Sequence, residues 1–200
     1  MLDLLLIGCH SLPDETGRIG RVLREYGMET GGIPFVSSQD TRMVTELIEH
    51  RTAMAGYRVE CLLHFCEEKT HLNALLSQGV RYAAMTTRYF RNVYELHDIM
   101  QYLRRADPRI RIVVGGGFFR SAASKLEPGE RRRLLELLGA DYYLFHDDCA
   151  PLVRSIVEAR FDVQRLAQIP HLIWRETETG PYRSSAAVEG NRALNFAPLA

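Results

Sequence analysis

The chain has no net charge, no paired cysteines and no long hydrophobic run. Lys and Arg together number 25, as do Asp and Glu, so no overall charge draws the chain to nucleic acid or to a membrane. Its 4 cysteines form no CxxC pair and no zinc-spaced cluster with histidine, which predicts buried or free thiols in a reducing cytoplasm. The apolar run at residues 4–7 is too short to cross a bilayer and lacks the basic segment of a signal peptide. We therefore expect a cytoplasmic protein with neither a nucleic-acid nor a membrane partner.

Several common motifs of α/β proteins are also missing. No GxxxxGK[ST] segment occurs, no GxGxxG follows the first predicted strand, and there is no GxSxG elbow. A phosphoacceptor receiver domain needs an acidic pair after its first strand and an Asp after its third. Here those strands end in Ile7-Gly8-Cys9 and Met85-Thr86. These absences argue against P-loop, dinucleotide-binding, α/β-hydrolase and receiver functions.

Short apolar runs alternate along the chain with segments of helical period. The pattern predicts a doubly wound, flavodoxin- or Rossmann-like α/β fold whose parallel sheet has five strands and helices on both faces. The predicted strands are residues 2–7, 57–65, 80–85, 110–114 and 141–145. The predicted helices include residues 69–77, 92–105, 130–138 and 151–160, a segment from about residue 40 towards residue 56, and a helical pattern at residues 19–27.

The pattern changes after Phe161. Residues 171–176 and 181–184 flank a Glu-Thr-Gly turn, which predicts a C-terminal β-hairpin followed by an extended tail. We expect residues 1–161 to form a ligand-binding domain and residues 162–200 to form a hairpin and linker. The arginine clusters at residues 104–105 and 131–133 are interpreted as solvated helix faces.

The candidate site lies where the predicted parallel strands end, because open α/β sheets bind ligands at the carboxyl edge. The triple glycine Gly115-Gly116-Gly117 removes every Cβ that would keep a large flat ligand away, or it is only a tight turn. Thr86 and Thr87 are candidates for hydrogen bonds to amide or phosphate oxygens, or for capping the helix that starts near Asn92. Arg88 has two interpretations, since it either pairs with a phosphate or is solvated. His10 and His146 are either metal ligands or ordinary loop histidines.

The order of several segments resembles a known family. The chain contains, in this order, a strand ending in VVGG, a helix, the segment GADYY and the segment IPHLIWRETETG. Together they resemble the N-terminal cobalamin-binding domain of cobalamin-dependent radical S-adenosylmethionine enzymes, over about residues 2–185. The opening LDLLLIGCH is similar to the branch that includes phosphinate P-methyltransferases. The resemblance implies a domain that holds base-off cobalamin for methyl transfer from S-adenosylmethionine to an acceptor.

The resemblance also implies a set of cofactor-binding residues, with no catalytic residue and no metal ligand in this chain. They are Cys9, His10, Thr86, Thr87, Arg88, Tyr89, Gly115, Gly116, Gly117, Phe118, Tyr143, Phe145 and His146. The DxHxxG signature of other cobalamin proteins is absent, so no protein histidine is expected on cobalt. The family's usual Gly-Glu after the fifth strand is replaced by His146-Asp147-Asp148.

The CxxxCxxC motif of radical S-adenosylmethionine enzymes is absent from the chain. The iron–sulfur cluster and S-adenosylmethionine are therefore expected in a missing or partner radical SAM catalytic domain, in cis or in trans. Two other interpretations stay open at this point. One is a non-catalytic flavodoxin-like interaction or sensory domain. The other is a small-molecule enzyme that uses Asp147, Asp148 or His146 as acid or base.

Overall fold

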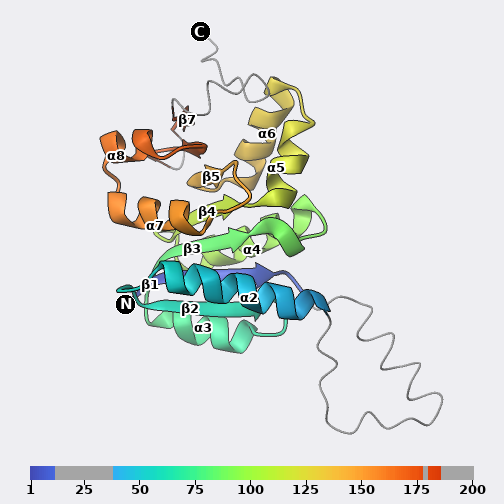
Figure 1. The fold of residues 1–200 in the computed structure, drawn as a ribbon, viewed down its shortest axis with the longest axis vertical. Coiled ribbons are helices and arrows are strands. Elements are labelled where there is room, and N and C mark those ends of the chain that lie inside the picture. The colour runs from blue at the N-terminus through green and yellow to red at the C-terminus, as the bar shows by residue number, and fades with distance from the viewer. Residues whose placement is uncertain (12–37, 178–179, 186–200) are drawn as a thin grey trace, which may run out of the picture.

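The computed structural model describes residues 1–11, 38–177 and 180–185. Figure 1 shows the order of the helices and strands. They are β1 (Leu2–Cys9), α2 (Ser38–Ala53), β2 (Val59–His64), α3 (Lys69–Ser77), β3 (Val80–Thr86), the 3-10 turn η1 (Thr87–Tyr89), α4 (Val93–Ala106), β4 (Arg111–Gly115), α5 (Gly117–Ser124), α6 (Pro128–Leu138), β5 (Tyr142–Leu144), α7 (Ala150–Ala159), α8 (Val163–Gln168), β6 (Leu172–Trp174) and β7 (Arg183–Ser184).

All strands belong to one sheet in the order β2-β1-β3-β4-β5-β6-β7. The pairs among β1 to β5 are parallel, which confirms the five predicted parallel strands. The predicted hairpin also forms, but β6 pairs antiparallel with β5, and β7 with β6. The prediction of a five-stranded sheet was therefore wrong. The hairpin strands join the sheet because β6 is buried along its length and covers an edge of β5 that would otherwise be open.

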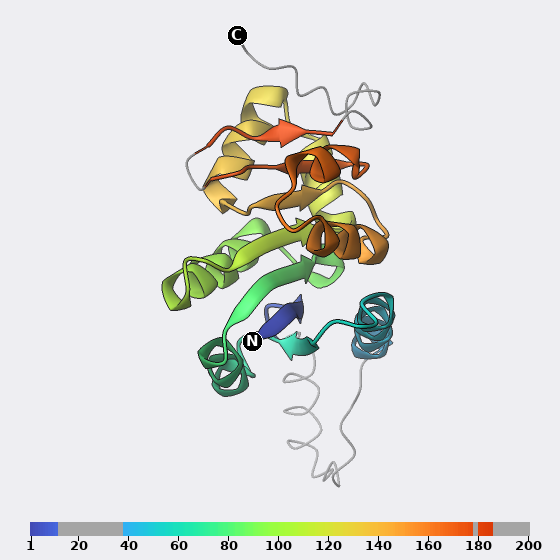
Figure 2. The ribbon, with the colours of Figure 1, turned by 90° about the vertical axis from the view of Figure 1, so that its left-hand side faces the viewer.

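Helices cover both faces of the sheet, as predicted (Figure 2). Alternate strand residues separate the core into two clusters. Leu5, Ile7 and Val114 face the layer of α3, α4, α5 and α6, whereas Leu4 and Leu6 face α2, α7 and α8. Within the described part of the chain, no helix is both long and apolar enough to span a membrane.

Local sequence signals explain several helix boundaries. The Asn92 side chain accepts hydrogen bonds from the backbone N–H groups of Tyr94 and Glu95, so α4 begins where predicted. Glu127 and Glu130 form a capping box at the start of α6. The short helices α5 and α8 were not predicted, because one or two turns are too short to display a helical period. The pattern at residues 19–27 lies outside the described residues.

The buried face of α2 differs from the predicted stripe. Met43 and Leu47 are buried as expected, but Ile48 is 57% exposed and His50 is buried. The inward positions are therefore spaced by four and then three residues, as a single helix face requires. Glu46 lies on the same side of the helix, between Met43 and Leu47 in sequence.

Two arginines in the predicted solvated clusters are instead structural, so the prediction was wrong for both. The Arg131 guanidinium is buried and donates to the carbonyl oxygens of Ala123 and Leu126. These bonds hold the connection between α5 and α6. The Arg104 guanidinium is largely buried and binds Asp141.

Asp141 connects three elements through one carboxylate that is fully buried. Its oxygens accept from Arg104 Nη2 at 2.5 Å, from Arg111 Nη1 at 2.8 Å and from the Ile112 backbone N–H at 2.8 Å. The donors come from α4 and β4, and Asp141 itself directly precedes β5. The interaction therefore fixes β5 against β4 and both strands against α4.

Replacement of this carboxylate tests its structural role. We expect Asp141→Asn to lower the free energy of unfolding by about 3–5 kcal/mol, because it leaves two partly buried guanidiniums without a counter-charge. Urea denaturation measures the change. The matched control is Glu136→Gln, which removes an exposed pair with Arg132 and should cost less than about 1 kcal/mol. Equal effects of the two substitutions would contradict the assignment.

Candidate functional site

The strand order 2-1-3-4-5 places a topological switch point between β1 and β3. The chain runs from β1 to β2 on one side and then crosses to β3 on the other. Ligands of open α/β sheets bind at such a point, outside the carboxyl ends of the strands. In the described residues this edge carries residues 8–11, 86–89, 115–118 and 145–149, so the predicted strand ends do meet at one edge.

The first two glycines after β4 are required by contacts within the chain. A Cβ at Gly115 would lie 2.8 Å from Cys149 Sγ and 2.9 Å from Leu144 Cβ. Gly116 has a φ of +105°, and a Cβ there would lie 3.0 Å from the Thr87 backbone nitrogen. The tight-turn interpretation therefore accounts for both residues without a ligand. A Cβ at Gly117 would approach only Asp147 Oδ1, at 3.2 Å.

Thr87 is fully buried and acts as a helix cap. Its Oγ1 accepts a hydrogen bond at 3.0 Å from the backbone N–H of Phe119, in the first turn of α5. The prediction that Thr86 and Thr87 cap the helix near Asn92 was therefore wrong, because Asn92 itself caps α4 and Thr87 caps α5 instead. Together with Gly116, Thr87 attaches η1 closely to the β4–α5 turn.

Thr86 differs from Thr87, because its hydroxyl is buried without a partner. The residue is 3% exposed, and its Oγ1 has no hydrogen-bond partner within the described part of the chain. It pairs with Gly115 of β4. On its other side lies Gly8, which follows Ile7, the partner of Met85. Thr86 therefore lies between two strand positions that have no Cβ.

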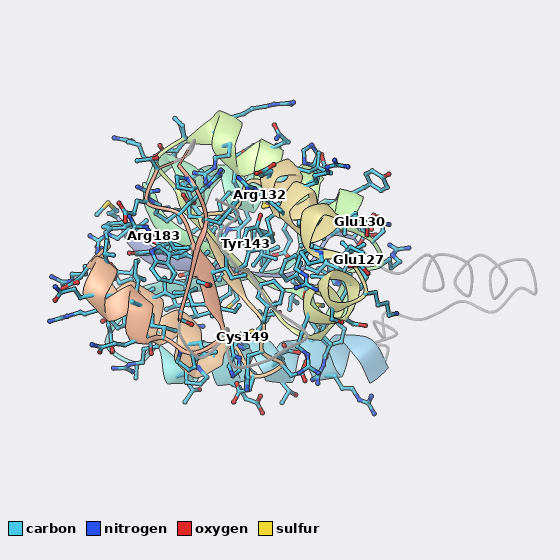
Figure 3. All side chains as sticks on the ribbon, turned by 90° about the horizontal axis from the view of Figure 1, so that it is seen from above. Glu127, Glu130, Arg132, Tyr143, Cys149 and Arg183 are labelled. Carbon is cyan, nitrogen blue, oxygen red and sulfur yellow. The ribbon has the colours of Figure 1, made fainter. Side chains whose placement is uncertain are left out.

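Side chains of α2 and of the residue before α7 occupy the space beside these glycines. Met43 Sδ of α2 would be 2.7 Å from a Cβ at Gly8, and Cys149 Sγ borders Gly115. Because Tyr82 and Ala84 of β3 face the α2 and α7 layer, Thr86 faces it too. Figure 3 shows Cys149 on this side of the molecule.

Two more polar side chains lie in this region. Glu46 is largely buried, and its Oε2 lies 3.7 Å from Arg88 Nη1. Burial is the largest effect and raises the pKa of Glu46, although His50 and Arg88 oppose it. The Tyr89 hydroxyl is buried beside Glu46, and burial raises its pKa as well. Burial also raises the pKa of Cys149 to about 12, with a smaller contribution from Glu46. We name Glu46, Thr86, Tyr89 and Cys149 the Thr86 cluster.

Exposed arginines surround this edge of the sheet. Arg88 is 64% exposed beside Glu46, and Arg120 of α5 pairs with Asp147 at 3.0 Å. Both guanidiniums are accessible to an anion, although each already has a carboxylate partner.

The predicted acid–base residues after β5 do not act on one another through their side chains. The His146 ring stacks on His171 with centroids 5.2 Å apart. Its Nδ1 contacts the backbone of Asp148, with the carbonyl oxygen at 2.8 Å and the amide nitrogen at 3.1 Å. Asp147 is engaged with Arg120. This arrangement offers little support for the small-molecule enzyme interpretation.

Two aromatic candidates lie within the core. Tyr143 is fully buried, its hydroxyl donates to Leu135 O at 2.7 Å and accepts from Ala140 N at 3.0 Å. Burial raises its pKa well above the usual value, and Figure 3 shows it in the interior of the molecule. Phe145 is buried beside Phe119. Phe118, in contrast, is only partly buried at the edge.

The two candidates at the end of β1 lie on opposite faces of the sheet: Cys9 belongs to the core cluster that contains Cys149, and only His10 lies apart from the Thr86 cluster. Cys9 is buried, and its thiol donates to Leu63 O at 3.3 Å. The His10 ring packs against Phe65 on the α3 and α4 side of the sheet, and its Nε2 lies 3.0 Å from Asp98 Oδ2. The structure therefore brings Thr86, Arg88, Tyr89 and Gly115 together and leaves His10 on the opposite face.

The sequence interpretation missed Glu46, Cys66 and Asp98. Glu46 had a usable signal, since a carboxylate inside an apolar helix stripe is unusual. Asp98 and Cys66 had none, because their contacts with His10 join residues far apart in sequence. No group of three or more His, Cys, Asp or Glu side chains is arranged to hold a metal ion among residues 1–11, 38–177 and 180–185.

A cavity of about 480 Å³ lies at the other end of the sheet. Its lining includes Met1, Arg51, Tyr57, Arg58 and Gln78. These residues precede or begin the strands, so the cavity is remote from the carboxyl edge and does not include the Thr86 cluster.

Comparisons with protein-family models, with curated proteins and with solved structures found no match for this chain.

The packing of Gly116 can be tested by substitution. We expect Gly116→Ala to lower the free energy of unfolding by about 1–3 kcal/mol, because its backbone conformation is nearly restricted to glycine. Gly129→Ala is the control, since its Cβ would meet nothing within 4 Å, and it should be neutral or stabilising by up to about 1 kcal/mol. Thermal denaturation compares both with the parent. A neutral Gly116→Ala would show that the turn does not depend on this contact.

Proposed function

We propose that this chain is a cobalamin-binding domain, which holds base-off cobalamin for methyl transfer from S-adenosylmethionine to an acceptor. The radical SAM catalytic domain would be supplied in cis or in trans. The observation that carries the proposal is the buried, unpartnered hydroxyl of Thr86 at the switch point of the sheet. A buried hydroxyl without a hydrogen bond costs free energy, and a ligand that binds it would recover that cost.

The chemistry of the Thr86 cluster suits a ligand rich in amides. Thr86 and Tyr89 hydroxyls both donate and accept hydrogen bonds. Because burial raises the pKa of Glu46, its carboxyl group holds a proton to higher pH than usual and can then also donate. These side chains would bind carboxamide groups of the corrin or hydroxyls of the nucleotide tail.

The charge at the edge suits the phosphodiester of that tail. Arg88 and Arg120 are half or more exposed, and a guanidinium binds a phosphate through paired hydrogen bonds. Each would exchange its carboxylate partner, Glu46 or Asp147, for the phosphate. Gly117 would allow close approach of the backbone once Asp147 turns away.

The chain's own residues would bind and orient the cofactor and exclude water from it. When bound, cobalamin supplies a carrier for the methyl group, and the protein contributes positioning and control of axial ligation. The expectation of a cofactor held without a histidine on cobalt rests on the missing DxHxxG signature, since the contacts of His146 with the Asp148 backbone engage Nδ1 and not Nε2. Burial raises the pKa of the Cys149 thiol to about 12, so the thiol stays protonated at neutral pH and would not bind cobalt as a thiolate.

Retention of hydroxocobalamin tests the proposal. The purified chain is mixed with hydroxocobalamin and desalted, and its visible spectrum is recorded. We expect a retained corrin spectrum without the shift that histidine ligation produces. Thr86→Val should weaken retention by about 10-fold, the effect of one lost hydrogen bond of about 1.4 kcal/mol. Its fold should remain intact, because no hydrogen bond of the free protein is removed.

The control variant is Thr52→Val in the last turn of α2, where the hydroxyl donates to Ile48 O away from the carboxyl edge. This substitution should leave retention unchanged. A colourless parent protein after desalting would refute cobalamin binding and favour the interaction or sensory interpretation. Equal retention by Thr86→Val and the parent would remove the Thr86 cluster from the site.

A further inference from the structure

A second group of reactive side chains lies at the carboxyl edge on the α3 and α4 face. Cys66 follows β2, His10 follows β1, and Asp98 belongs to α4. The Cys66 Sγ lies 3.8 Å from each ring nitrogen of His10, and His10 Nε2 lies 3.0 Å from Asp98 Oδ2. The segments after β2 and β1 and the helix α4 thus place a thiol, an imidazole and a carboxylate next to one another, in that order.

The contact with Asp98 sets the tautomer of His10. A carboxylate accepts a proton, so Nε2 carries the hydrogen and Nδ1 keeps its lone pair. Nδ1 is then the nitrogen that can accept the thiol proton. A nucleophile within reach of a base that a third group orients is the arrangement of activated thiols.

Aromatic contacts hold the imidazole in place. The His10 ring packs on Phe65 at a centroid distance of 5.7 Å, and Phe65 in turn meets Tyr102 edge-on at 5.3 Å. Phe65 is fully buried, so the surface on which His10 rests is part of the core. The His10 ring is therefore oriented from below by Phe65 and at Nε2 by Asp98.

Cys66 cannot ionise readily by itself. Burial raises the pKa of the Cys66 thiol, and the carboxylates of Glu67, Asp98 and Glu95 add to that effect, while Lys69 opposes it. The thiol is therefore protonated at neutral pH, and its reaction requires a base. His10 is the base within reach.

We propose that Cys66 is a nucleophilic thiol for which His10 is the general base and Asp98 the positioning residue. Its substrate class is a carbon electrophile that carries a leaving group. In the step, the sulfur–carbon bond forms and the bond from that carbon to the leaving group breaks. The leaving group departs with the bonding pair, and the thiol proton passes to Nδ1 of His10. This site is independent of cobalamin, because the sheet separates it from the Thr86 cluster.

Alkylation by iodoacetamide, followed residue by residue with mass spectrometry, tests the site without cobalamin. We expect Cys66 to react at least about 10-fold faster than Cys61, which is also partly exposed but has Arg51 and Glu60 as its charged neighbours. The Cys66 rate should reach its plateau at a lower pH than the Cys61 rate, because a base within reach removes the thiol proton. Cys9 and Cys149 are buried and serve as slow internal references.

Variants of His10 and Asp98 distinguish the general base from the positioning residue. His10→Gln should slow alkylation of Cys66 by about 100-fold at pH 7.5 and move its rise to the alkaline range of a thiol with a raised pKa. Asp98→Asn should slow alkylation of Cys66 and move its rise towards that of His10→Gln, because the carboxylate that holds the His10 tautomer is lost. Cys66→Ser identifies the labelled peptide.

Equal rates at Cys66 and Cys61, or an unchanged pH profile in His10→Gln, would overturn the proposal. Circular dichroism confirms that each variant is folded. If His10→Gln unfolds, the shift in Asp98→Asn decides the question, since Asp98 is a largely exposed helix residue whose replacement leaves the core intact. A profile of Asp98→Asn that matches the parent would then refute the base assignment. Failure of cobalamin retention has no bearing on these rates.

Discussion

The carboxyl edge of this sheet depends on an interaction near the other end of its strands. The buried carboxylate of Asp141 binds two guanidiniums and the Ile112 amide, and so aligns β5 with β4. That alignment pairs Gly115 with Leu144. It thereby sets where the β4 turn meets the segment that carries Cys149. One ion-pair cluster thus positions groups that lie several residues further along both strands.

Close contacts then divide the edge into two faces with different chemistry. Gly116 lies against Thr87, and Thr87 caps α5, so the turns after β3 and β4 are joined without space for a side chain. Thr86 points to the α2 and α7 layer, where Glu46 is largely buried and the Tyr89 hydroxyl is enclosed. His10 points to the α3 and α4 layer beside Cys66. Adjacent strands of one sheet therefore present a hydrogen-bonding cluster on one face and a thiol–imidazole pair on the other.

Sequence patterns predicted the five parallel strands and most helix positions, because burial on both faces produces apolar runs that are visible locally. These sequence patterns gave wrong predictions where the environment of a residue depends on a partner that is distant in sequence. The sequence predicted that Arg104 and Arg131 are solvated, but the oxygens that accept their hydrogen bonds belong to other segments of the chain. The hairpin was predicted, but its attachment to β5 was not, since strand pairing is not encoded in either segment alone. At the site, the triple glycine drew attention to the correct edge, although two of the three glycines serve internal packing. Glu46 and Asp98 became candidates only through the fold.

For this reason, the unpartnered Thr86 hydroxyl is stronger evidence for the proposed site than the glycines are. A glycine that another atom of the chain already contacts is explained by the folded protein alone. A buried hydroxyl without a partner is not, because valine would occupy the same volume without the cost of removing a hydroxyl from water, about 1–3 kcal/mol. That cost disappears only when something outside the described residues supplies a hydrogen bond. The proposed site is therefore centred on an unsatisfied group at the switch point, and a ligand that binds it would have to reach between α2 and the sheet.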